Sequence, residues 1–420
     1  MALIVQKFGG TSVGSIERIR HVAAWALDSQ AQGNDIVLVV SAMSGETNRL
    51  VELALQINPI PFSREYDLLI SSGEQVAVGL VTLAINTEAE KRGWIKKGEH
   101  AARGFLGHQI GILTDSTFSK ARIQQIDTGL LNQCIGSKII PVIAGFQGVD
   151  ADQNITTLGR GGSDTSAVAI AAALQADDCE IYTDVDGVYT TDPRLCAKAQ
   201  KIKRISYDEM MELASLGAKV LQIRSVEIAA KYQLPLHVRS SFDSVEGTRV
   251  VPREGLGGVM ENVVVAGVAA DASQVKLTLQ NLVEGPGVAA ELFGALSQAA
   301  IVVDVIVQDV PSHGILTISF TVNRADYLKA KEVIQGLRST SFSQMRMLEE
   351  LSLAKVSVVG VGMQNHPGVA SKMFSLLAQA GISIKLITTS EIKISCLISD
   401  AQMKQAVECL HQGFELDQLS

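Results

Sequence analysis

The chain has 420 residues and a mass of 44.7 kDa, enough for two or three domains with hydrophobic cores of their own. Hydrophobic residues make up 47% and charged residues 19%, which excludes a disordered or low-complexity protein. The net charge of −8 argues against a nucleic-acid partner, because binding to phosphate backbones needs a basic surface.

The cysteines and the N-terminus indicate a cytoplasmic protein. The five cysteines have no C-x-x-C spacing, so they suggest neither a disulfide framework nor a zinc site. The chain reaches Lys7 and Gly9 too early to form the apolar core of a signal peptide. Apolar runs such as 76–85 are far shorter than the roughly 20 residues that span a bilayer, so we expect no membrane span.

Apolar segments of strand length alternate with helix-period segments up to about residue 245. This alternation predicts an α/β domain with a mainly parallel sheet. Loops rich in Gly, Ser, Thr and Asp follow several of the predicted strands, and ligands of open α/β sheets bind at the carboxyl ends of strands. These loops should therefore share one crevice. The predicted strands are 2–7, 36–40, 139–144, 180–183 and 236–238.

The first motif is VQKFGGTS at 5–12, in which a strand ending in Lys7 runs into two glycines and two hydroxyl residues. Such a loop presents backbone N–H groups and an ammonium group to an anion. It is not a Walker A loop, since the pattern G-x-x-x-x-G-K-[ST] is absent. An ordinary turn between a strand and a helix is the alternative interpretation.

The second motif is LGRGGSDTS at 158–166, followed by an Ala-rich helix at 167–173. Glycines allow close approach of the backbone, and Ser163 or Asp164 can cap the helix. Arg160 offers a planar guanidinium that suits a carboxylate ligand. The alternative is an ordinary N-cap with a surface arginine.

The third motif is YTDVDGVYTTDPR at 182–194. It is not an EF-hand, because the alternating acidic positions fail after Gly187 and no bidentate Glu follows. A loop at a strand end with Tyr, Thr and Asp side chains suits the base and ribose of a nucleotide.

Two single residues give weaker signals. Glu74 follows Gly73 at the start of a mainly apolar helix, and Lys219 lies in the segment LGAKV. Each of these side chains could contact a ligand or be solvated, and the sequence favours neither interpretation. No histidine lies in a metal-ligand or catalytic-triad spacing, so we assign the histidines no catalytic role. We also predict no metal-ligating residues in the chain.

The C-terminal part contains an internal repeat. Residues 284–306 and 365–387 align with a constant offset, and Pro, Gly, Val and Ala at 286–289 recur at 367–370. Each copy combines an amphipathic helix with neighbouring strands, which predicts two β-α-β-β-α-β units. The predicted strands are 275–279, 301–306 and 316–320 in the first copy, and 355–359, 382–387 and 393–398 in the second.

These motifs, in this order and at these distances, resemble the aspartate kinases. The resemblance covers essentially the whole chain and rests on KFGGTSV, SGE, GRGGSD, TDVDGVYTTDPR and the two repeats. It implies an amino-acid-kinase domain at 1–245, a linker at 246–262, and ACT domains, which sense amino acids, at 263–340 and 341–420. One ACT unit inserted into the other, or borrowing a strand from 263–268, is an open alternative to two consecutive units.

The resemblance implies ATP, Mg²⁺ and L-aspartate as ligands, 4-phospho-L-aspartate as product, and a role in lysine, threonine and methionine biosynthesis. Glu74 would bind the α-amino group of aspartate and Arg160 its α-carboxylate. Lys7 and Asp164 would be the catalytic residues, with Asp164 ordering Lys7 and the substrate. The implied substrate-binding residues are Thr47, Glu74, Arg160, Ser163 and Asp164. The implied ATP-binding residues are Lys7, Phe8, Gly9, Gly10, Thr11, Ser41, Thr183, Asp184, Tyr189, Asp192, Arg194, Lys219 and Val220.

The family also implies feedback inhibition by lysine, by threonine or by both, through the ACT repeats. Ser383 stands where relatives commonly carry Asn, which leaves the identity of the inhibitor open. We expect the ACT sheets to pair between chains and form a homodimer or homotetramer. The implied effector-binding residues are Glu284, Gln308, Gly368, Val369, Ala370, Ser383, Ile384, Thr389, Ser390 and Glu391.

Two other hypotheses compete with this one. The chain could phosphorylate another small acid, such as glutamate or acetylglutamate, but the complete motif set and the tandem repeats argue against this. It could also be a non-catalytic amino-acid sensor that keeps the kinase fold. The presence of Lys7, Arg160 and Asp164 argues against a sensor.

Overall fold

The computed structural model describes residues 1–215, 220–253, 264–309, 313–337, 339–361, 363 and 367–418. The chain forms two compact units. The first consists of Met1–Tyr189 and Lys201–Met260, and the second of Thr190–Gln200 and Glu261–Ser420. The segment 190–200, which we expected within the first domain, is therefore part of the second unit.

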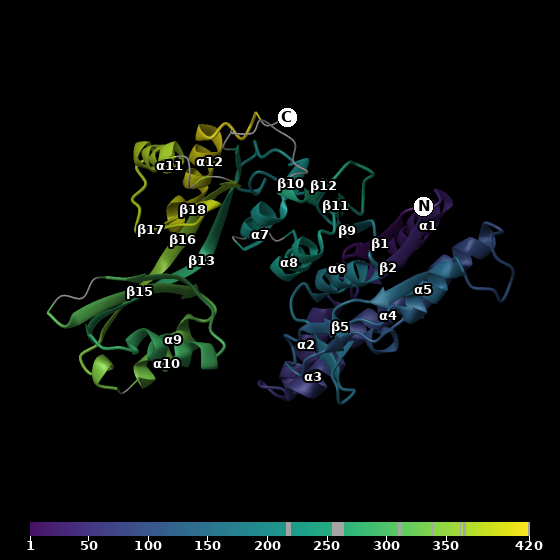
Figure 1. Ribbon diagram of the computed structural model, residues 1–420, viewed down its shortest axis with the longest axis horizontal. Helices are drawn as coiled ribbons and strands as arrows, with labels where there is room; N and C mark the ends of the chain where they lie inside the picture. The colour runs from purple at the N-terminus through teal and green to yellow at the C-terminus, as the bar shows by residue number, and fades with distance from the viewer. Residues whose placement is uncertain are drawn as a thin grey trace. The chain divides into compact units, whose positions relative to one another are not determined.

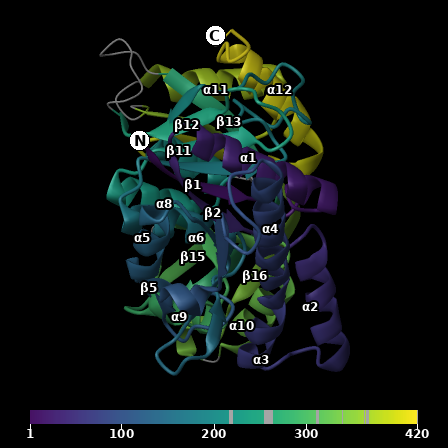
Figure 2. The ribbon, with the colours of Figure 1, turned by 90° about the vertical axis from the view of Figure 1, so that its right-hand side faces the viewer.

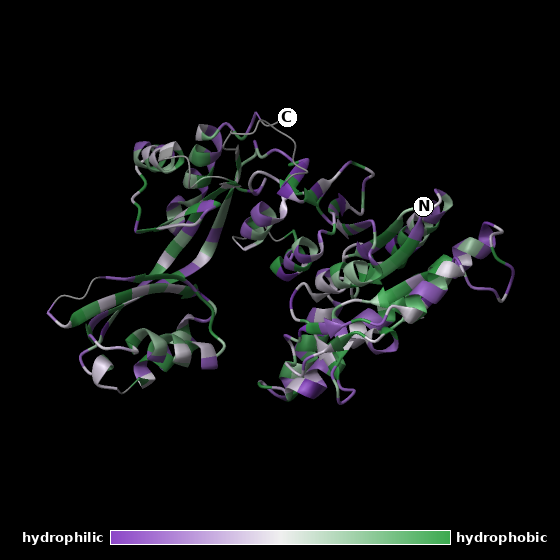
Figure 3. Cartoon of the chain, viewed as in Figure 1, coloured by the Kyte–Doolittle hydropathy of each residue, from purple (hydrophilic) through white to green (hydrophobic). Residues whose placement is uncertain are grey.

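The first unit is built on an eight-stranded sheet (Figure 1). Neighbouring strands are parallel, except that β11 and β12 are antiparallel. The five strands predicted from the sequence are confirmed, as β1, β2, β6, β9 and β11, and they are contiguous in the sheet. Figure 3 shows that these central strands are mostly hydrophobic, as expected for a sheet covered on both faces. The spatial order is β10 (Arg204–Ser206), β12 (Thr248–Val251), β11 (Leu236–Ser240), β9 (Asp178–Thr183), β1 (Leu3–Phe8), β2 (Asp35–Val40), β6 (Ile140–Ala144), β3 (Ala102–Phe105).

Helices cover both faces of this sheet. Phe8 of β1 and Tyr182 of β9 are buried in a core with residues of α1 and α4, which lie against each other (Figure 2). Side chains alternate along a strand, so Lys7 points to the opposite face, where α6 contacts β1 and β9. The helices are α1 (Ile16–Ala31), α2 (Glu46–Ile57), α3 (Ser63–Ile70), α4 (Ser72–Lys91), η1 (Gly107–Ile110), α5 (Gly129–Gly136), α6 (Gly162–Leu174), α7 (Tyr207–Ser215) and α8 (Ile223–Tyr232).

A smaller four-stranded sheet completes the first unit. Its strands are short, and the sequence did not predict them. In spatial order they are β5 (Ile123–Gln125), β4 (Leu113–Thr114), β7 (Gln147–Val149) and β8 (Ile155–Thr157).

The helical run Ser63–Lys91, which joins α3 and α4, is long and apolar enough to cross a membrane by length and composition alone. Core helices of soluble proteins meet the same criterion. Ala77, Val81 and Ile85 of α4 are fully buried in the core that this helix shares with α1. We therefore interpret the run as a core element of the first unit.

The second unit has one six-stranded sheet in which all neighbouring strands are antiparallel. In spatial order the strands are β14 (Val303–Gln308), β15 (Ile315–Asn323), β13 (Val264–Val283), β16 (Arg346–Val361), β18 (Lys393–Ser399) and β17 (Leu386–Thr389). The helices are α9 (Val288–Gln298), α10 (Tyr327–Gly336), η3 (Thr340–Phe342), α11 (Pro367–Gln379), η5 (Asp400–Gln402) and α12 (Met403–Gly413).

The two repeats share the long strands β13 and β16. Residues 264–271 of β13 pair with the end of β16, next to β18, whereas residues 276–280 pair with its beginning, next to β15. One core gathers around Leu277, Leu292 and Phe320. The other contains Val268 of β13 together with Cys396 and residues of α11 and α12. The strand segment that precedes the first repeat thus completes the core of the second.

One predicted strand is displaced in the structure. We expected a strand at 382–387, but β17 begins at Leu386 and continues to Thr389. Ile382 is instead buried in the connection after α11, where its side chain joins the core of the second repeat. An apolar residue anchored in a loop produced the same local pattern as a strand.

Candidate active site

The loops after β1, β2 and β9 meet at the carboxyl edge of the large sheet. The N–H of Ser41 donates to the carbonyl of Phe8 at 3.1 Å, and the N–H of Ser44 donates to the carbonyl of Gly10 at 3.1 Å. The N–H of Gly9 donates to the carbonyl of Tyr182 at 3.1 Å. The convergence that the sequence predicted for these loops is therefore present.

Lys7 and Asp164 form an ion pair at this edge. Nζ of Lys7 lies 2.7 Å from Oδ1 of Asp164, and only 9% and 8% of the two residues are exposed. Asp164 is in the first turn of α6, where the positive end of the helix dipole stabilises a carboxylate. Because Asp164 already binds an ammonium group, it is suited to holding Lys7 in place and not to abstracting a proton.

The glycines after Lys7 allow the loop to approach its neighbours closely. A Cβ atom on Gly10 would lie 2.8 Å from the carbonyl oxygen of Ala42, so a larger residue would displace one of the two loops. Within the described part of the chain, the N–H groups of Gly10 and Thr11 donate to no protein acceptor. Together with Lys7 they form a group of donors suited to an anion.

Glu74 lies buried near the beginning of α4, with 3% of the residue exposed. Its Oε1 accepts a hydrogen bond of 3.1 Å from the N–H of Ala42, which ties α4 to the loop after β2. Oε2 is buried and has no hydrogen-bond partner among the described residues. Burial raises the pKa of Glu74 to about 7, and the bond from Ala42 offsets only part of this effect. The carboxyl group is thus prepared for a cationic ligand.

The segment that leads to Arg160 is held by a residue that the sequence analysis missed. Asp67 of α3 is fully buried and accepts hydrogen bonds from Thr157 N–H at 2.7 Å, from Ser119 N–H at 2.8 Å and from the Ser119 hydroxyl at 2.8 Å. Arg224 of α8 donates to the carbonyl of Leu158 at 2.7 Å. Asp67 is one of three charged residues in α3, so the local sequence gave no signal that its carboxylate is buried.

Arg160 itself is exposed, and it makes no ion pair or hydrogen bond with residues that the structure describes. Gly161, which follows it, has a φ of 69° and serves as the N-cap of α6. Ser163 is buried against Gly145, where a Cβ atom would lie 2.8 Å from the Ser163 side chain. Thr47 is half-buried in α2. The guanidinium of Arg160 is therefore available to an external carboxylate.

The residues expected at the nucleotide are divided between the two units. Thr183 ends β9 and donates to Asp184 at 3.1 Å, and the Tyr189 hydroxyl donates to Asp186 at 2.9 Å. Asp192 pairs with Arg194 at 2.7 Å, and both belong to the second unit.

Phe8, Val220 and Lys219 were also expected at the nucleotide. The Phe8 ring stacks on Tyr182 at 4.6 Å between centroids, on the face of the sheet opposite Lys7, so Phe8 offers only its backbone to the site. Val220 is half-buried. Lys219 lies outside the described residues.

The expected effector residues also fall into two groups. Val369, Ala370 and Ile384 pack into or against the core of the second repeat. Their side chains therefore support the fold of this repeat, and only their backbone remains for a ligand. The exposed residues are Glu284, Gln308, Gly368, Ser383, Thr389, Ser390 and Glu391.

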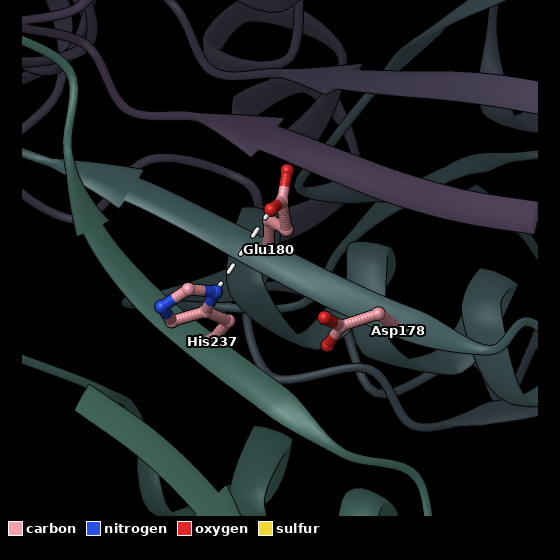
Figure 4. A group of neighbouring side chains, drawn as sticks. All are labelled: Asp178, Glu180 and His237. Carbon is pink, nitrogen blue, oxygen red and sulfur yellow. Dashed lines mark ion pairs between the residues drawn. The ribbon is translucent and has the colours of Figure 1, made fainter. Parts of the chain in front are cut away.

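A second polar cluster lies on the α1 face of the sheet, opposite Lys7. Oxygen or nitrogen atoms of Asp178, Glu180 and His237 lie within 4.8 Å of one another (Figure 4). However, Asp178 already pairs with Arg249 at 2.8 Å and Glu180 with Arg239 at 2.8 Å. A bound cation would add net charge to a buried, neutral ion-pair network, which is unfavourable. The cluster is therefore better explained as a structural network.

Comparisons with known proteins agree with this architecture. Residues 2–240 match the amino acid kinase family, and residues 356–414 match the ACT domain. An aspartate kinase of Stutzerimonas stutzeri is 50% identical over 417 residues, which cover 99% of this chain and 98% of that protein. An aspartokinase of Pseudomonas aeruginosa is 48% identical over the same length and with the same coverage.

Solved structures give the same result. The crystal structure of E. coli aspartokinase III with aspartate and ADP matches with a TM-score of 0.79 and 25% identity, over 98% of this chain and 99% of that one. The structure of the same enzyme with lysine and aspartate matches with a TM-score of 0.74 and 26% identity, with the same coverage. The chain thus belongs to the aspartate kinases, phosphotransferases of the amino acid kinase family that carry C-terminal ACT domains.

Proposed function

We propose that the chain transfers the γ-phosphoryl group of ATP to the side-chain carboxylate of L-aspartate. The products are 4-phospho-L-aspartate and ADP, and the reaction is a cytoplasmic step toward lysine, threonine and methionine. The observation that carries the proposal is the buried ion pair of Lys7 and Asp164 beside the free N–H groups of Gly10 and Thr11. The aspartate and ADP bound in the related E. coli structure support it.

The chemistry requires no general base. The side-chain carboxyl of aspartate has a reference pKa of about 3.9, so it is ionised at neutral pH and can attack phosphorus directly. The obstacle is the approach of one anion to another. Catalysis therefore depends on positioning and on neutralisation of charge, which Lys7 and the loop N–H groups supply.

Two residues account for the recognition of an α-amino acid. The unpartnered, buried Oε2 of Glu74 would accept the α-ammonium group, and the free guanidinium of Arg160 would bind the α-carboxylate. This pair distinguishes an amino acid with a free amino group from an N-acetylated one. Ser163 and Thr47 would complete the pocket around the side chain.

ATP would bind along the loops after β1, β2 and β9. The backbone of residues 8–11, with Ser41, would face the phosphates, and Thr183, Asp184 and Tyr189 would lie along the ribose and base. Mg²⁺ bound to the phosphates supplies further neutralisation of charge, as in other phosphoryl transfers. The exposed carboxylate of Asp184 suits such an ion, whereas Asp164 is occupied by Lys7.

The second unit would bind lysine, threonine or both, and would pair with a second chain. The lysine in the related E. coli structure supports an amino-acid effector. The sheet ends in β14 and β17, which expose Ile306 (51%), Val307 (37%) and Ile387 (45%). Exposed apolar edge strands tend to pair with other strands, which supports a homodimer or homotetramer through the ACT sheets.

The proposal is tested by trapping the acyl phosphate with hydroxylamine. Purified protein is incubated with ATP, Mg²⁺ and aspartate, glutamate or N-acetylglutamate, with and without lysine and threonine. We expect hydroxamate from aspartate only, and less of it with an effector. The control variant Lys138→Ala removes a surface lysine paired with Asp35 and should remain active. Hydroxamate from glutamate instead of aspartate would overturn the substrate assignment.

A further inference from the structure

The segment Thr190–Gln200 carries the chain from the first unit into the second and back. It begins directly after the loop 183–189 and ends directly before Lys201. Lys201 pairs with Tyr189 in an isolated β-bridge, so the loop is closed at its base within the first unit. Any contact that fixes Thr190 therefore also constrains the end of this loop through the covalent chain.

Thr190 is anchored by its backbone and by its side chain. Its carbonyl accepts a hydrogen bond of 2.7 Å from the N–H of Val268 in β13. Its Oγ1 lies 2.9 Å from Nε2 of His411 in α12 and accepts a second hydrogen bond, of 2.9 Å, from the N–H of Gln200. The N–H of Thr190 donates to the carbonyl of Gln200 at 2.9 Å. One residue thus joins both ends of the segment to two elements of the second repeat.

Apolar side chains reinforce this anchor. Cys196 is buried in the core of the second repeat, and Leu195 packs against that core. Nζ of Lys198 lies 3.7 Å from Oδ2 of Asp417, which follows α12. By its packing the segment therefore belongs to the core of the second repeat, although it lies within the kinase domain that the sequence predicted.

His411 is suited to a role as a fixed hydrogen-bonding group. Only 1% of the residue is exposed, and its Nδ1 has no partner among the described residues. Burial is the main reason that the pKa of His411 lies below its ordinary value; Asp417 raises the pKa and Lys198 lowers it. The neutral imidazole therefore predominates at pH 7. A neutral ring can donate or accept at Nε2. The loss of Thr190 would leave a buried ring without its one described partner.

We propose that His411 is a positioning residue for ATP, which acts through Thr190 on the loop 183–189. This inference rests on the proposed function, in which that loop lies along the nucleotide. Changes in the core of the second repeat that move α12 or β13 would then alter ATP binding. The aspartate-binding groups Glu74 and Arg160 would be unaffected, because neither is on this segment.

Two pairs of variants test the inference in the full-length protein. His411→Leu removes the ring nitrogens, whereas His411→Gln places an amide nitrogen near the position of Nε2. Thr190→Val removes the hydroxyl, whereas Thr190→Ser keeps it. We expect the Leu and Val variants to raise the KM for ATP about three- to tenfold, the effect of one lost buried hydrogen bond, with the KM for aspartate unchanged. The KM for ATP of the Gln and Ser variants should remain near that of wild type.

The double variant Thr190→Val/His411→Leu separates a shared contact from two independent defects. If the two residues act as one unit, its KM for ATP should match that of the single variants and not the product of their effects. Thermal melts must show all variants folded at the assay temperature. An unchanged KM for ATP in the Leu and Val variants, or an equal rise in both KM values, would overturn the inference.

The dissociation constant for ATP, measured by calorimetry, keeps this test independent of catalysis. Wild type that binds ATP but forms no aspartyl hydroxamate would refute the proposed function. The role of His411 would then be tested by ATP binding alone. The Leu and Val variants should bind ATP about three- to tenfold more weakly than wild type. Wild type that is active but shows equal ATP dissociation constants in all variants would refute the role of His411 and leave the proposed function intact.

Discussion

Nζ of Lys7 and Oδ1 of Asp164 lie 2.7 Å apart where a strand of the parallel sheet meets the first turn of a helix. This contact orients the ammonium group toward the loop that follows Lys7. A Cβ atom on Gly9 would lie 3.5 Å from the same Nζ, so the loop backbone and the ammonium group are close neighbours. The ion pair thus holds the ammonium group beside the loop backbone, in an arrangement suited to an anion.

The first prediction concerns the charge of Lys7. Lys7→Met should lower kcat by about 10²- to 10³-fold, because it removes a group that stabilises developing negative charge. It should also destabilise the fold, since it leaves Asp164 buried without its partner. Adding Asp164→Asn should restore much of the stability but none of the activity. Hydroxamate assays and urea titrations separate the two effects, and near-normal kcat in Lys7→Met would contradict the role assigned to Lys7.

The second prediction concerns the stability of the ligand-free protein. Burial raises the pKa of Glu74 from its ordinary value of 4.5 to about 7 in the folded protein, so its buried acid form favours folding at low pH. This contribution is complete below about pH 4.5 and is lost as the pH rises through 7. Glu74→Gln should therefore stabilise the protein at pH 8 by up to about 3 kcal/mol, and little at pH 4.5.

Urea denaturation at the two pH values measures this difference. Glu90→Gln, an exposed change in the same helix, serves as the control and should show no pH-dependent gain. Equal stability of Glu74→Gln and wild type at pH 8 would contradict the raised pKa of Glu74.

The third prediction concerns protons released on binding. A carboxyl with a pKa of about 7 is roughly half protonated at pH 7, and an ammonium group beside it lowers that pKa. Aspartate binding at pH 7 should therefore release about half a proton. Calorimetry in buffers with different ionisation enthalpies gives the number directly. Proton uptake, or the same release in Glu74→Gln, would contradict the contact between Glu74 and the amino group.

The fourth prediction concerns Asp67. Asp67→Asn replaces one acceptor oxygen by a donor next to the N–H groups of Ser119 and Thr157, which should cost about 1–3 kcal/mol of stability. It should also raise the KM for aspartate more than the KM for ATP, because the segment it supports leads to Arg160. Steady-state kinetics and thermal melts test this, with exposed Asp152→Asn as control. A loss of stability without the change in the aspartate KM would limit Asp67 to a structural role.

The fifth prediction concerns His237 in the second polar cluster. Burial and the nearby Arg249 and Arg239 lower its pKa in the folded protein to about 4 from the ordinary value of 6.5. The unfolded chain therefore binds a proton that the folded chain does not, and stability should fall as the pH drops from about 6.5 to 4. His237→Leu should weaken this dependence, and exposed His21→Gln should leave it unchanged. An identical pH dependence in wild type and His237→Leu would contradict the lowered pKa.

The sequence predicted the parts of the fold that are encoded by local patterns. The central strands are continuous apolar runs followed by polar loops, and the repeats are visible as aligned letters. The short strands β3, β5 and β8 and the outer strands β10 and β12 lack such runs, since each has few residues and partly exposed faces.

The contacts that the sequence analysis missed depend on distant partners. Asp67 of α3 accepts hydrogen bonds from Thr157 of β8 and from Ser119, and no local sequence pattern joins these residues. The apolar residues Leu195 and Cys196 lie within the predicted kinase domain 1–245, because sequence alone does not show which core receives a buried side chain. Packing assigned them to the second repeat.

In the proposed reaction, a side-chain oxygen of aspartate receives the phosphoryl group beside Lys7. The most direct test is ³¹P NMR of the reaction of ATP with aspartate that carries ¹⁸O in its side-chain carboxylate. We expect an aspartate-dependent acyl phosphate signal shifted by one bridging ¹⁸O, present with wild type and absent with Lys7→Met. An unshifted signal, or ADP formation without an acyl phosphate, would contradict the proposed reaction.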